Sequence, residues 1–596
     1  MTTYTAPLQD SAFVLEHVIG FDQLCETLNH SEITVDLAKT IIEEAGKLAS
    51  EVLSPLNIVG DQQHPVTSAG QVTETPGFSQ AYQQYIDNGW PTLTAPEEFG
   101  GQALPNVIGT AVNELWHSAN MAFALCPMLS QGAIEALIAH GSPGLQQQYL
   151  PKLISGEWTG TMNLTEPNAG SDLAAVACKA IPDGNALKII GQKIFITWGD
   201  HQMTPNIVHL VLARLPDAPA GVKGISLFIV PKYIIDENGQ LGELNDVNCS
   251  SLEHKLGIHG SPTCVMNFGD QGGAVGYLVG EANKGLSYMF TMMNHARQSV
   301  GLQGLSISER AYQQSRQYSQ ERIQGLNAQG EKAAIIQHPD VRRMLMAMKS
   351  GTEAMRALAL TAAADIDLAH NNQFEQSEKQ QQQKRVELLT PIVKGWMTEF
   401  AQELTSLNIQ VHGGMGFVEE TGAAQHYRDA RILPIYEGTT GIQALDLIGR
   451  KTLSDNGQSL KQLLAEIQST AELLTNHDNS QLQQIGEKLG HALDHALTAT
   501  DWILENAANN KLLAGNVSFD NLMMMGYLVG GWLLAKSAHA ASVLIDQEND
   551  YGHAFLATKI NTAVFYSHYY LPRVSQHKDI VCTGLVSILD LSAEQF

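Results

Sequence analysis

The run LKIIGQKIFIT (residues 187–197) and three short runs after it decide the fold class of this chain. All four are rich in β-branched and aromatic residues and are bounded by turn residues, a pattern typical of strands. The later runs are NIVHLVLARL (206–215), GISLFIVPKY (224–233) and SPTCVMNFG (261–269). The stretch 156–276 is therefore predicted to form a separate, mainly β unit.

On both sides of this unit apolar residues recur every three or four positions, which is the helical period. The pattern covers residues 11–56 and 78–150, returns after Gly285 in segments long enough for a helix bundle, and continues from about Ser454 to the end. The polar stretch 371–384 is predicted to be an exposed loop. The apolar stretch 523–535 is too short to span a bilayer and is predicted to be a buried helix.

Composition excludes several classes of protein. At 596 residues the chain is expected to fold as two to four packed units. A formal net charge of −26 repels phosphate backbones, so nucleic acid is not an expected partner, and an anionic ligand would need a local positive pocket. Six scattered cysteines without CxxC indicate a reducing compartment, and no signal peptide or integral membrane segment is predicted, so we expect a cytoplasmic protein.

Several common catalytic motifs are missing from the sequence. It contains no GxxxxGK[ST] phosphate loop, no HExxH, no GxSxG and no GxGxxG after a strand. None of the 21 histidines pairs with an acidic residue at convincing metal-ligand spacing. We therefore expect no metal site.

Three segments combine glycine, hydroxyl residues and single charges: MNLTEPNAGSD (162–172), QVHGGMGF (410–417) and PIYEGTTGIQ (434–443). Together with QKIFIT (192–197), HKLGIHGSPT (254–263) and GEANKGL (280–286), in this order, they resemble the signature series of the FAD-dependent acyl-CoA dehydrogenase family. The resemblance runs from about Pro91 to Lys451. Residues 1–23 and those beyond 453 resemble the enlarged subgroup that includes 3-methylmercaptopropionyl-CoA dehydrogenase and some longer-chain enzymes.

The resemblance implies a fold that is mainly α, with a central β-barrel-like domain and an additional C-terminal helical domain. The expected domains are an N-terminal helical domain (1–155), a central β domain (156–280), a helical bundle with the catalytic glutamate (281–453) and the additional helical domain (454–596). This order agrees with the independent helix, strand, helix pattern.

The implied reaction removes the α-proton and the β-hydride of an acyl-CoA, giving a trans-2-enoyl-CoA. Glu437 matches the family base, and its backbone N–H is expected to help hold the thioester oxygen. One branch of the family carries its base at the position of Ala296, so Glu437 is the only matched candidate. Arg297 matches a residue on the CoA side of the site, and Asn294 stands where many relatives have aspartate. The implied substrate contacts are Ser171, Asn294, Arg297 and Gly438.

The implied FAD contacts fall into two groups. Those around the flavin ring, with N5 as the hydride acceptor, are Leu164, Thr165, Gly170, Ser171, Phe195 and Thr197, and Phe195 replaces a tryptophan common in relatives. Those expected to hold the adenylate and pyrophosphate of a neighbouring subunit's FAD are Arg322, Gln410, Gly414 and Thr439. A homodimer is therefore expected, although Gly441 replaces a glutamine usual after the YEGT motif.

Four functions remain open at this point. A dehydrogenase of fatty acid β-oxidation that passes electrons to an electron-transfer flavoprotein is favoured by the motif set. An acyl-CoA oxidase is barely separable from it by sequence, a DNA-associated flavoprotein would need a basic face, and an inactive scaffold is disfavoured by Glu437. The acyl chain is not predicted, because Met289, Phe290, Met292 and Met293 suit either an acyl pocket or the bundle core.

Overall fold

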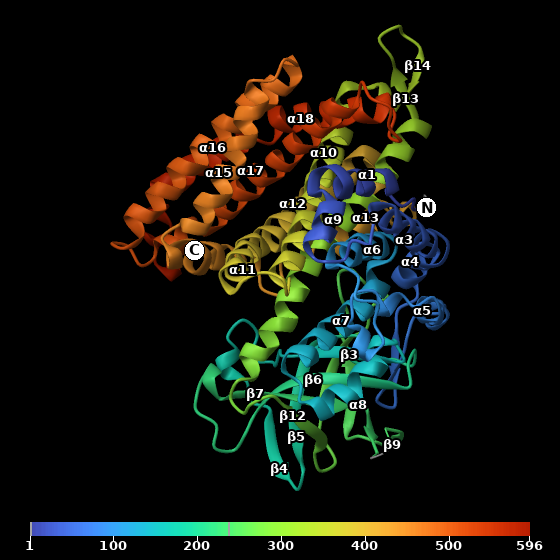
Figure 1. The fold of residues 1–596 in the computed structure, drawn as a ribbon. Coiled ribbons are helices and arrows are strands. Elements are labelled where there is room, and N and C mark those ends of the chain that lie inside the picture. Colours follow the sequence, from blue (N-terminus) through green and yellow to red (C-terminus); the bar gives the residue numbers. More distant parts are fainter. Residues whose placement is uncertain (1–2, 237–238) are drawn as a thin grey trace. The chain divides into compact units, whose positions relative to one another are not determined.

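The structure, a computed structural model, describes residues 3–236 and 239–596 and divides into two compact units (Figure 1). Unit 1 consists of residues 1–46, 105–118 and 297–596, and unit 2 consists of residues 47–104 and 119–296. Helices α3 (Val35–Leu48) and α9 (Gly285–Glu321) each begin in one unit and end in the other.

An eight-stranded sheet is the centre of unit 2. Its strands follow the order β10-β11-β5-β12-β7-β6-β3, and β4 pairs with β5 and β6. Among the described residues no pairing joins the end strands β10 and β3, so the observed element is a central sheet, and its barrel-like character stays a prediction. The strands are β3 (Trp158–Asn163), β4 (Lys179–Asp183), β5 (Ala186–Thr197), β6 (Asn206–Arg214), β7 (Ile225–Pro231), β10 (Val247–Leu252), β11 (Thr263–Phe268) and β12 (Ala274–Val279). The four runs predicted as strands are confirmed as β5, β6, β7 and β11.

Strand β5 changes its partner along its length. Its first half pairs with β12, with Ile189 opposite Ala274, and its second half pairs with β11, with Thr197 opposite Thr263. Two residues of β5 lie between Lys193 and Ile196, but only Val265 of β11 lies between their partners, so β5 has one extra residue at this point. This β-bulge bends the strand and redirects the side chains next to it.

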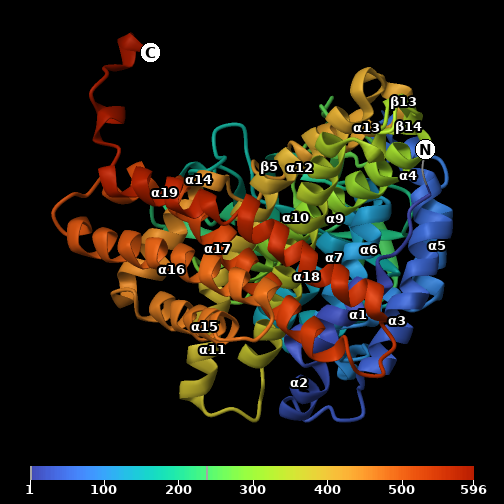
Figure 2. The same ribbon diagram turned by 90° about the horizontal axis from the view of Figure 1, so that it is seen from above.

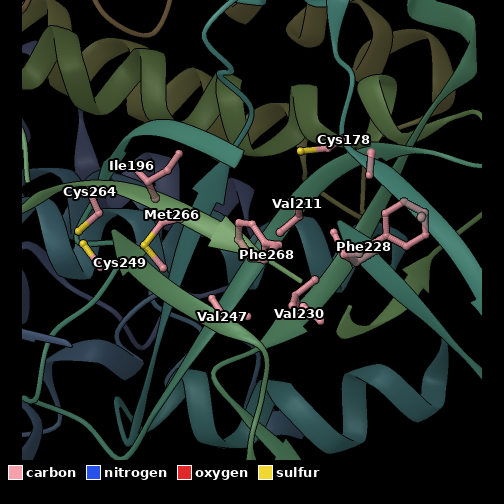
Figure 3. Packing of buried hydrophobic residues seen from close by; sticks show 14 of the residues in the cluster. Cys178, Ile196, Val211, Phe228, Val230, Val247, Cys249, Cys264, Met266 and Phe268 are labelled. Atoms are coloured by element: carbon pink, nitrogen blue, oxygen red, sulfur yellow. The ribbon is translucent and has the colours of Figure 1, made fainter. Parts of the chain in front are cut away.

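The hydrophobic core of unit 2 lies against this sheet (Figure 3). Strands β6 and β7 are buried along almost their whole length, as expected for central strands covered on both faces. The core residues that line the sheet include Cys178, Ile196, Val211, Phe228, Val230, Met266 and Phe268.

Helices and two small hairpins complete unit 2. They are α4 (Ser54–Gln62), α5 (Phe78–Asp87), α7 (Met121–His140), α8 (Pro143–Ile154), β1 (Val66–Ser68) with β2 (Gln71–Thr73), and β8 (Tyr233–Ile235) with β9 (Leu241–Leu244). Helix α7 packs closely on β3, because a Cβ at Gly160 would lie 2.6 Å from the Ala133 Cβ. In the described part of the chain, α7 alone is long and apolar enough to cross a membrane, and most of it is buried, as in a core helix.

Unit 1 is built from helices, with one hairpin of β13 (Ile323–Leu326) and β14 (Lys332–Ala334). Its earlier helices are α1 (Leu8–Phe13), α2 (Phe21–Thr27), α6 (Asn106–Ala119), α10 (Pro339–Ala369), α11 (Gln376–Pro391), α12 (Met397–His412), α13 (Ala423–Ala430) and α14 (Thr440–Asp446). The loop predicted for 371–384 is wrong, because α11 begins at Gln376. Its N-terminus carries a capping box of Glu375 and Glu378, and the glutamines that follow are good helix formers.

Five further helices lie beyond residue 453, and α15, α16 and α17 run side by side (Figures 1 and 2). They are α15 (Gln458–Thr475), α16 (Ser480–Ala507), α17 (Leu513–Leu544), α18 (His553–Tyr569) and α19 (Pro572–Thr583). The predicted buried helix at 523–535 is confirmed within α17. This helix packs tightly on the π-helical turn η8 (Ile392–Trp396), because a Cβ at Gly526 would lie 2.0 Å from the Trp396 ring.

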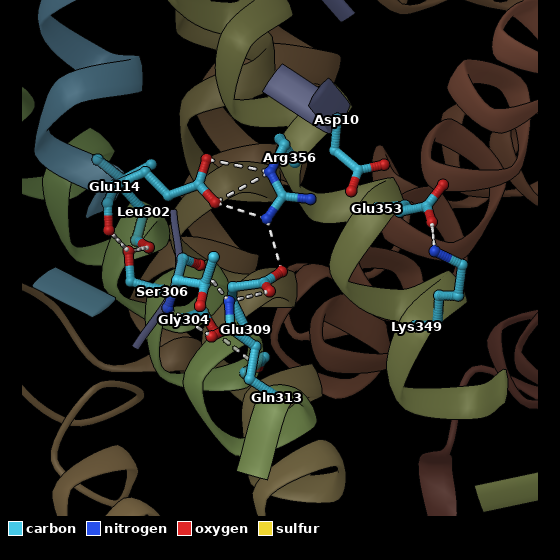
Figure 4. Close-up of polar contacts among 12 residues, drawn as sticks. Asp10, Glu114, Leu302, Gly304, Ser306, Glu309, Gln313, Lys349, Glu353 and Arg356 are labelled. Carbon is cyan, nitrogen blue, oxygen red and sulfur yellow. Dashed lines mark hydrogen bonds and ion pairs between the residues drawn. The ribbon is translucent and has the colours of Figure 1, made fainter. Parts of the chain in front are cut away.

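A group of paired charges is buried inside unit 1 (Figure 4). Arg356 donates to Glu114 at 2.7 and 2.9 Å and to Glu309 at 2.7 Å. All three residues are at most 5% exposed. Because a buried charge is costly without a partner, this group ties α6, α9 and α10 together only while all its members are present.

Candidate active site

Glu437 lies in unit 1 in a tight turn between α13 and α14. Its φ is +55°, in the left-handed region, and the next residue, Gly438, has a φ of +92°. Such backbone is costly for a residue with a side chain and persists where neighbours hold it. This φ favours glycine at position 438, and a Cβ there would also lie 2.6 Å from Gln443 Nε2, which would have to move.

Hydrogen bonds hold this turn from both sides. Thr439 caps α14, its Oγ1 accepting from the Ile442 N–H at 3.3 Å. Lys394 Nζ donates to the Gly438 carbonyl oxygen at 2.6 Å, and Thr440 Oγ1 donates to Glu399 Oε1 at 2.6 Å. The turn is therefore fixed on the segment formed by η8 and the start of α12.

The electrostatic setting of Glu437 suits a proton acceptor. Its side chain is half-buried, and burial raises the pKa of the carboxyl to about 7. The positive charges of Arg297 and Lys394 oppose this rise. Burial also lowers the pKa of the Lys394 ammonium to about 7 and lowers the pKa of the Arg297 guanidinium.

The predicted substrate contacts on α9 lie close together in sequence but fall in different units. Arg297 is half-buried in unit 1, where Asp446 and Glu437 favour its charged form. Asn294 is exposed in unit 2. Met289 and Met292 are fully buried, and Met292 packs on Gly132 of α7, which supports the core interpretation of these two methionines, whereas Phe290 and Met293 are half-buried.

In unit 2 the structure brings the segment 164–166 against β5. The Ile194 N–H donates to the Thr165 carbonyl oxygen at 2.9 Å. Behind this contact the buried Lys193 ammonium donates to the Leu164 carbonyl oxygen at 3.0 Å and pairs with Glu166 at 2.7 Å. These bonds fix Leu164 and Thr165, and the turn that follows leaves Gly170 and Ser171 exposed.

Phe195 lies at the β-bulge of β5 in the left-handed region, with a φ of +60°. Its ring is 58% exposed, although large aromatic side chains are usually buried. Thr197, two residues on, is half-buried and opposite Thr263. The bulge therefore presents a free aromatic face next to a hydroxyl group.

A third group lies in unit 1 where the C-terminal ends of α9 and α12 meet. The rings of Tyr318 and His412 stack with centroids 4.2 Å apart. Arg322 follows α9 directly, with its N–H donating to the Tyr318 carbonyl oxygen at 2.8 Å, and Gln410 lies in the last turn of α12. Arg322, Gln410 and Gly414 are all exposed.

Apart from Asn294, the predicted site residues form three local groups: 437–439 with Arg297, 164–171 with Phe195 and Thr197, and Arg322 with Gln410 and Gly414. Sequence reasoning did not identify Lys394 or Glu399. A charged residue in the otherwise apolar run LLTPIVKGW (388–396) was the available signal for Lys394, since an isolated charge within a buried helix needs a partner.

Four family models match successive parts of the chain. They are described as the N-terminal domain (residues 57–157), the middle domain (161–271) and the C-terminal domain (283–453) of acyl-CoA dehydrogenases, and as "Acetyl-CoA dehydrogenase C-terminal like" (463–592). Together they match most of the sequence.

Two curated relatives align with almost the whole chain. A 3-methylmercaptopropionyl-CoA dehydrogenase of Ruegeria pomeroyi is 46% identical over 98% of both chains. The broad-specificity linear acyl-CoA dehydrogenase FadE5 of Mycobacterium tuberculosis is 33% identical over 100% of both.

Solved structures with the same fold are more distant in sequence. ACDH-11 of Caenorhabditis elegans, in complex with C11-CoA, has a TM-score of 0.77 at 20% identity, covering 96% of this chain and 93% of that one. An acyl-CoA dehydrogenase of Bacillus anthracis complexed with FAD has a TM-score of 0.74 at 20% identity, covering 94% and 91%.

Proposed function

Because the chain belongs to the acyl-CoA dehydrogenase family of FAD-dependent oxidoreductases, we propose that it oxidises the α,β-carbon bond of an acyl-CoA with Glu437 as the base. The observation that carries this proposal is the placement of the Glu437 carboxyl, half-buried in a left-handed turn and close enough to Arg297 and Lys394 to feel their charges. Burial there raises the pKa of the carboxyl to about 7, and the two cations oppose the rise. The product is the trans-2-enoyl-CoA.

The raised pKa of Glu437 improves it as a base. A thioester α-proton is only weakly acidic, so an ordinary surface carboxylate would take it poorly. A carboxyl with a pKa of about 7 has a higher proton affinity, and it is still largely ionised in mildly alkaline solution. The left-handed backbone at Glu437 sets the direction in which its side chain leaves the turn.

Arg297 serves the CoA side of the substrate in this proposal. Its guanidinium supplies positive charge in a protein of net charge −26, and it holds the pKa of Glu437 below the value that burial alone would give. Asn294, Ser171 and Gly438 are the further proposed substrate contacts. The backbone N–H groups at 437 and 438 are proposed to hold the thioester oxygen while negative charge develops there.

The residues of unit 2 fit the flavin ring of FAD. The exposed Phe195 ring offers a flat apolar face, Thr165 and Thr197 add hydroxyl groups, and a side chain at Gly170 would meet no atom within 4 Å, which leaves open space beside the turn. FAD, when bound, supplies the hydride acceptor at N5. The buried Lys193–Glu166 pair ties this segment to β5.

A homodimer is proposed from the third group of residues. Arg322, Gln410 and Gly414 of this group, together with Thr439 of the first group, are assigned to the partner's FAD. Exposed apolar side chains lie close in sequence to Arg322 and Gly414. The exposed fractions are 87% for Phe417, 45% for Met415, 60% for Ile323 and 60% for Leu326. Exposed apolar side chains that gather in one region commonly mark an interaction surface.

The finer assignments are proposals of the same kind. We propose four domains, with bounds 1–155, 156–280, 281–453 and 454–596. We also propose electron-transfer flavoprotein as the electron acceptor and a role in fatty acid β-oxidation.

A cytoplasmic location is supported by the six cysteines, all free thiols. Similarity to the 46% identical relative supports a thioether acyl chain as the substrate of this protein. Similarity to the 33% identical relative supports a linear acyl chain.

The test is anaerobic bleaching of the bound flavin by a series of acyl-CoAs from short to long, including 3-methylmercaptopropionyl-CoA. We expect bleaching by at least one member, slow reoxidation in air and fast reoxidation by electron-transfer flavoprotein. Fast reoxidation by air would instead assign an oxidase. Absence of bleaching by every member, in protein that has retained FAD, would contradict the proposed function.

A further inference from the structure

We propose that Lys394 is a positioning residue for Glu437, holding the catalytic turn through Gly438 and supplying a positive charge beside the carboxylate. The inference rests on the proposed function of Glu437 and concerns what makes that carboxylate available. Lys394 itself contacts the turn, so it acts through Glu437.

Two side chains from the segment formed by η8 and the start of α12 hold the catalytic turn. Lys394 Nζ donates to the carbonyl oxygen of Gly438 at 2.6 Å, directly after Glu437. Five residues on, Glu399 accepts from Thr440 Oγ1 at 2.6 Å. One side chain thus holds the turn immediately after Glu437, and the other holds the first residue of α14.

The helix that carries Lys394 is irregular at this point. Residues 392–396 form a π-helical turn, η8, between α11 and α12. A π-turn inserts an extra residue and changes the direction of the side chains around it, and such turns are frequent at functional sites. Lys394 is therefore presented to the turn from a segment that departs from regular helix.

The additional C-terminal helices keep Lys394 away from water. Its side chain is 0% exposed. A Cβ at the next residue, Gly395, would lie 2.5 Å from Leu522 Cδ2 of α17, and Trp396 packs directly on Gly526 of the same helix. The backing of the catalytic turn is thus a structural role for the C-terminal helical domain.

Burial lowers the pKa of the Lys394 ammonium, and two nearby carboxyl groups counteract this effect. Glu437 and Glu399 favour its charged form, while burial and Arg297 oppose it. The charged form of Arg297 is disfavoured by burial and by Arg450, and it is favoured by Asp446 and Glu437. With Lys394 neutral or absent, the Glu437 carboxylate would lose one of its two positive neighbours, and its pKa would rise.

The deciding experiment measures the pKa of Glu437 itself. Infrared difference spectra identify its carboxyl band as the one lost in Glu437→Gln, and that band is followed against pH in the FAD-loaded protein. In Lys394→Met we expect the midpoint to move up by roughly one unit. Such a shift lowers the ionised fraction at pH 7 by roughly fivefold, and flavin bleaching should slow by at least that factor.

A matched control is Lys536→Met on α17. The Lys536 ammonium also donates to a backbone carbonyl oxygen, that of Val18 at 3.0 Å, and burial also lowers its pKa. Glu437 is not among the groups that shift the pKa of Lys536, so this variant should leave the Glu437 midpoint unchanged. If Lys394→Met does not fold, Lys394→Gln, which keeps an N–H donor but no charge, should show the same upward shift.

An unchanged Glu437 midpoint in the Lys394 variant would overturn the inference, whatever the variant's stability or rate. Failure of the proposed function looks different, because the wild-type flavin would then not bleach with any acyl-CoA. The titration reads the carboxyl group directly, so it decides the role of Lys394 in either case.

Discussion

Replacing Arg356 by methionine removes the cation that pairs with two buried carboxylates in unit 1. Glu114 is 0% exposed and Glu309 is 5% exposed, and Arg356 donates to both of them at 2.7 Å. Methionine fills a similar volume but leaves these two charges without their guanidinium partner. Breaking a buried ion pair by removing one member costs about 3–5 kcal/mol, and we expect a loss of this size in the free energy of unfolding.

The loss in the free energy of unfolding should be larger at high pH than at low pH. Burial already raises the pKa of Glu114, and Arg356 opposes that rise, so the pKa climbs further in Arg356→Met. The folded variant then binds a proton more tightly than the unfolded chain does. The contribution of Glu114 to the stability of the variant is therefore greatest at low pH and is lost as pH rises through its folded pKa. The deficit should therefore be smaller at pH 5.5 than at pH 8.

Urea unfolding followed by circular dichroism at both pH values measures the effect. The triple variant Arg356→Met, Glu114→Gln, Glu309→Gln should recover much of the lost stability, because no buried charge of the group remains. If Arg356→Met unfolded at the wild-type urea concentration, or showed the same deficit at both pH values, the reasoning about this network would be refuted.

Three further predictions concern the proposed active site and its cofactor. The rate of flavin bleaching should rise with pH through about 7, because Glu437 must lose its proton before it can act as the base; a rate that is flat from pH 5.5 to 8.5 would exclude this assignment. Phe195→Ala should weaken FAD binding by roughly tenfold, measured by fluorescence titration of the apoprotein, and should leave the apoprotein's stability unchanged because the ring is exposed. Arg322→Gln should likewise release FAD more readily during gel filtration, since it removes a charged contact to phosphate; full retention of FAD would contradict its role.

The order of helices and strands could be predicted from local pattern because each pattern had a direct physical cause. Strands β5, β6, β7 and β11 are rich in β-branched and aromatic residues and end at turn residues, and the apolar stretch in α17 is long enough only for a buried helix. The stretch 371–384 was misinterpreted because polarity was equated with a loop. Its glutamines have good helix propensity, and the capping box at Glu375 and Glu378 was the decisive local signal.

The site was only partly predictable for a different reason. Glu437 could be assigned by resemblance because it lies in a motif of its own, but its neighbour Lys394 lies 43 residues earlier, outside every quoted motif. Their relation is a tertiary contact, the hydrogen bond from Lys394 to the Gly438 carbonyl oxygen, and no local pattern encodes that contact. The bulge that exposes Phe195 likewise depends on the register between β5 and β11.

The assignment of Glu437 as the base is tested most directly by stopped-flow flavin bleaching in wild type and Glu437→Gln at pH 8, with a saturating acyl-CoA that reduces the wild type. Glutamine keeps the size and a hydrogen-bonding oxygen but cannot accept the α-proton. We expect FAD and acyl-CoA to bind nearly as in wild type and the bleaching rate to fall by roughly 10⁴-fold or more. A mutant that bleached within a few-fold of the wild-type rate would show that Glu437 is not the base.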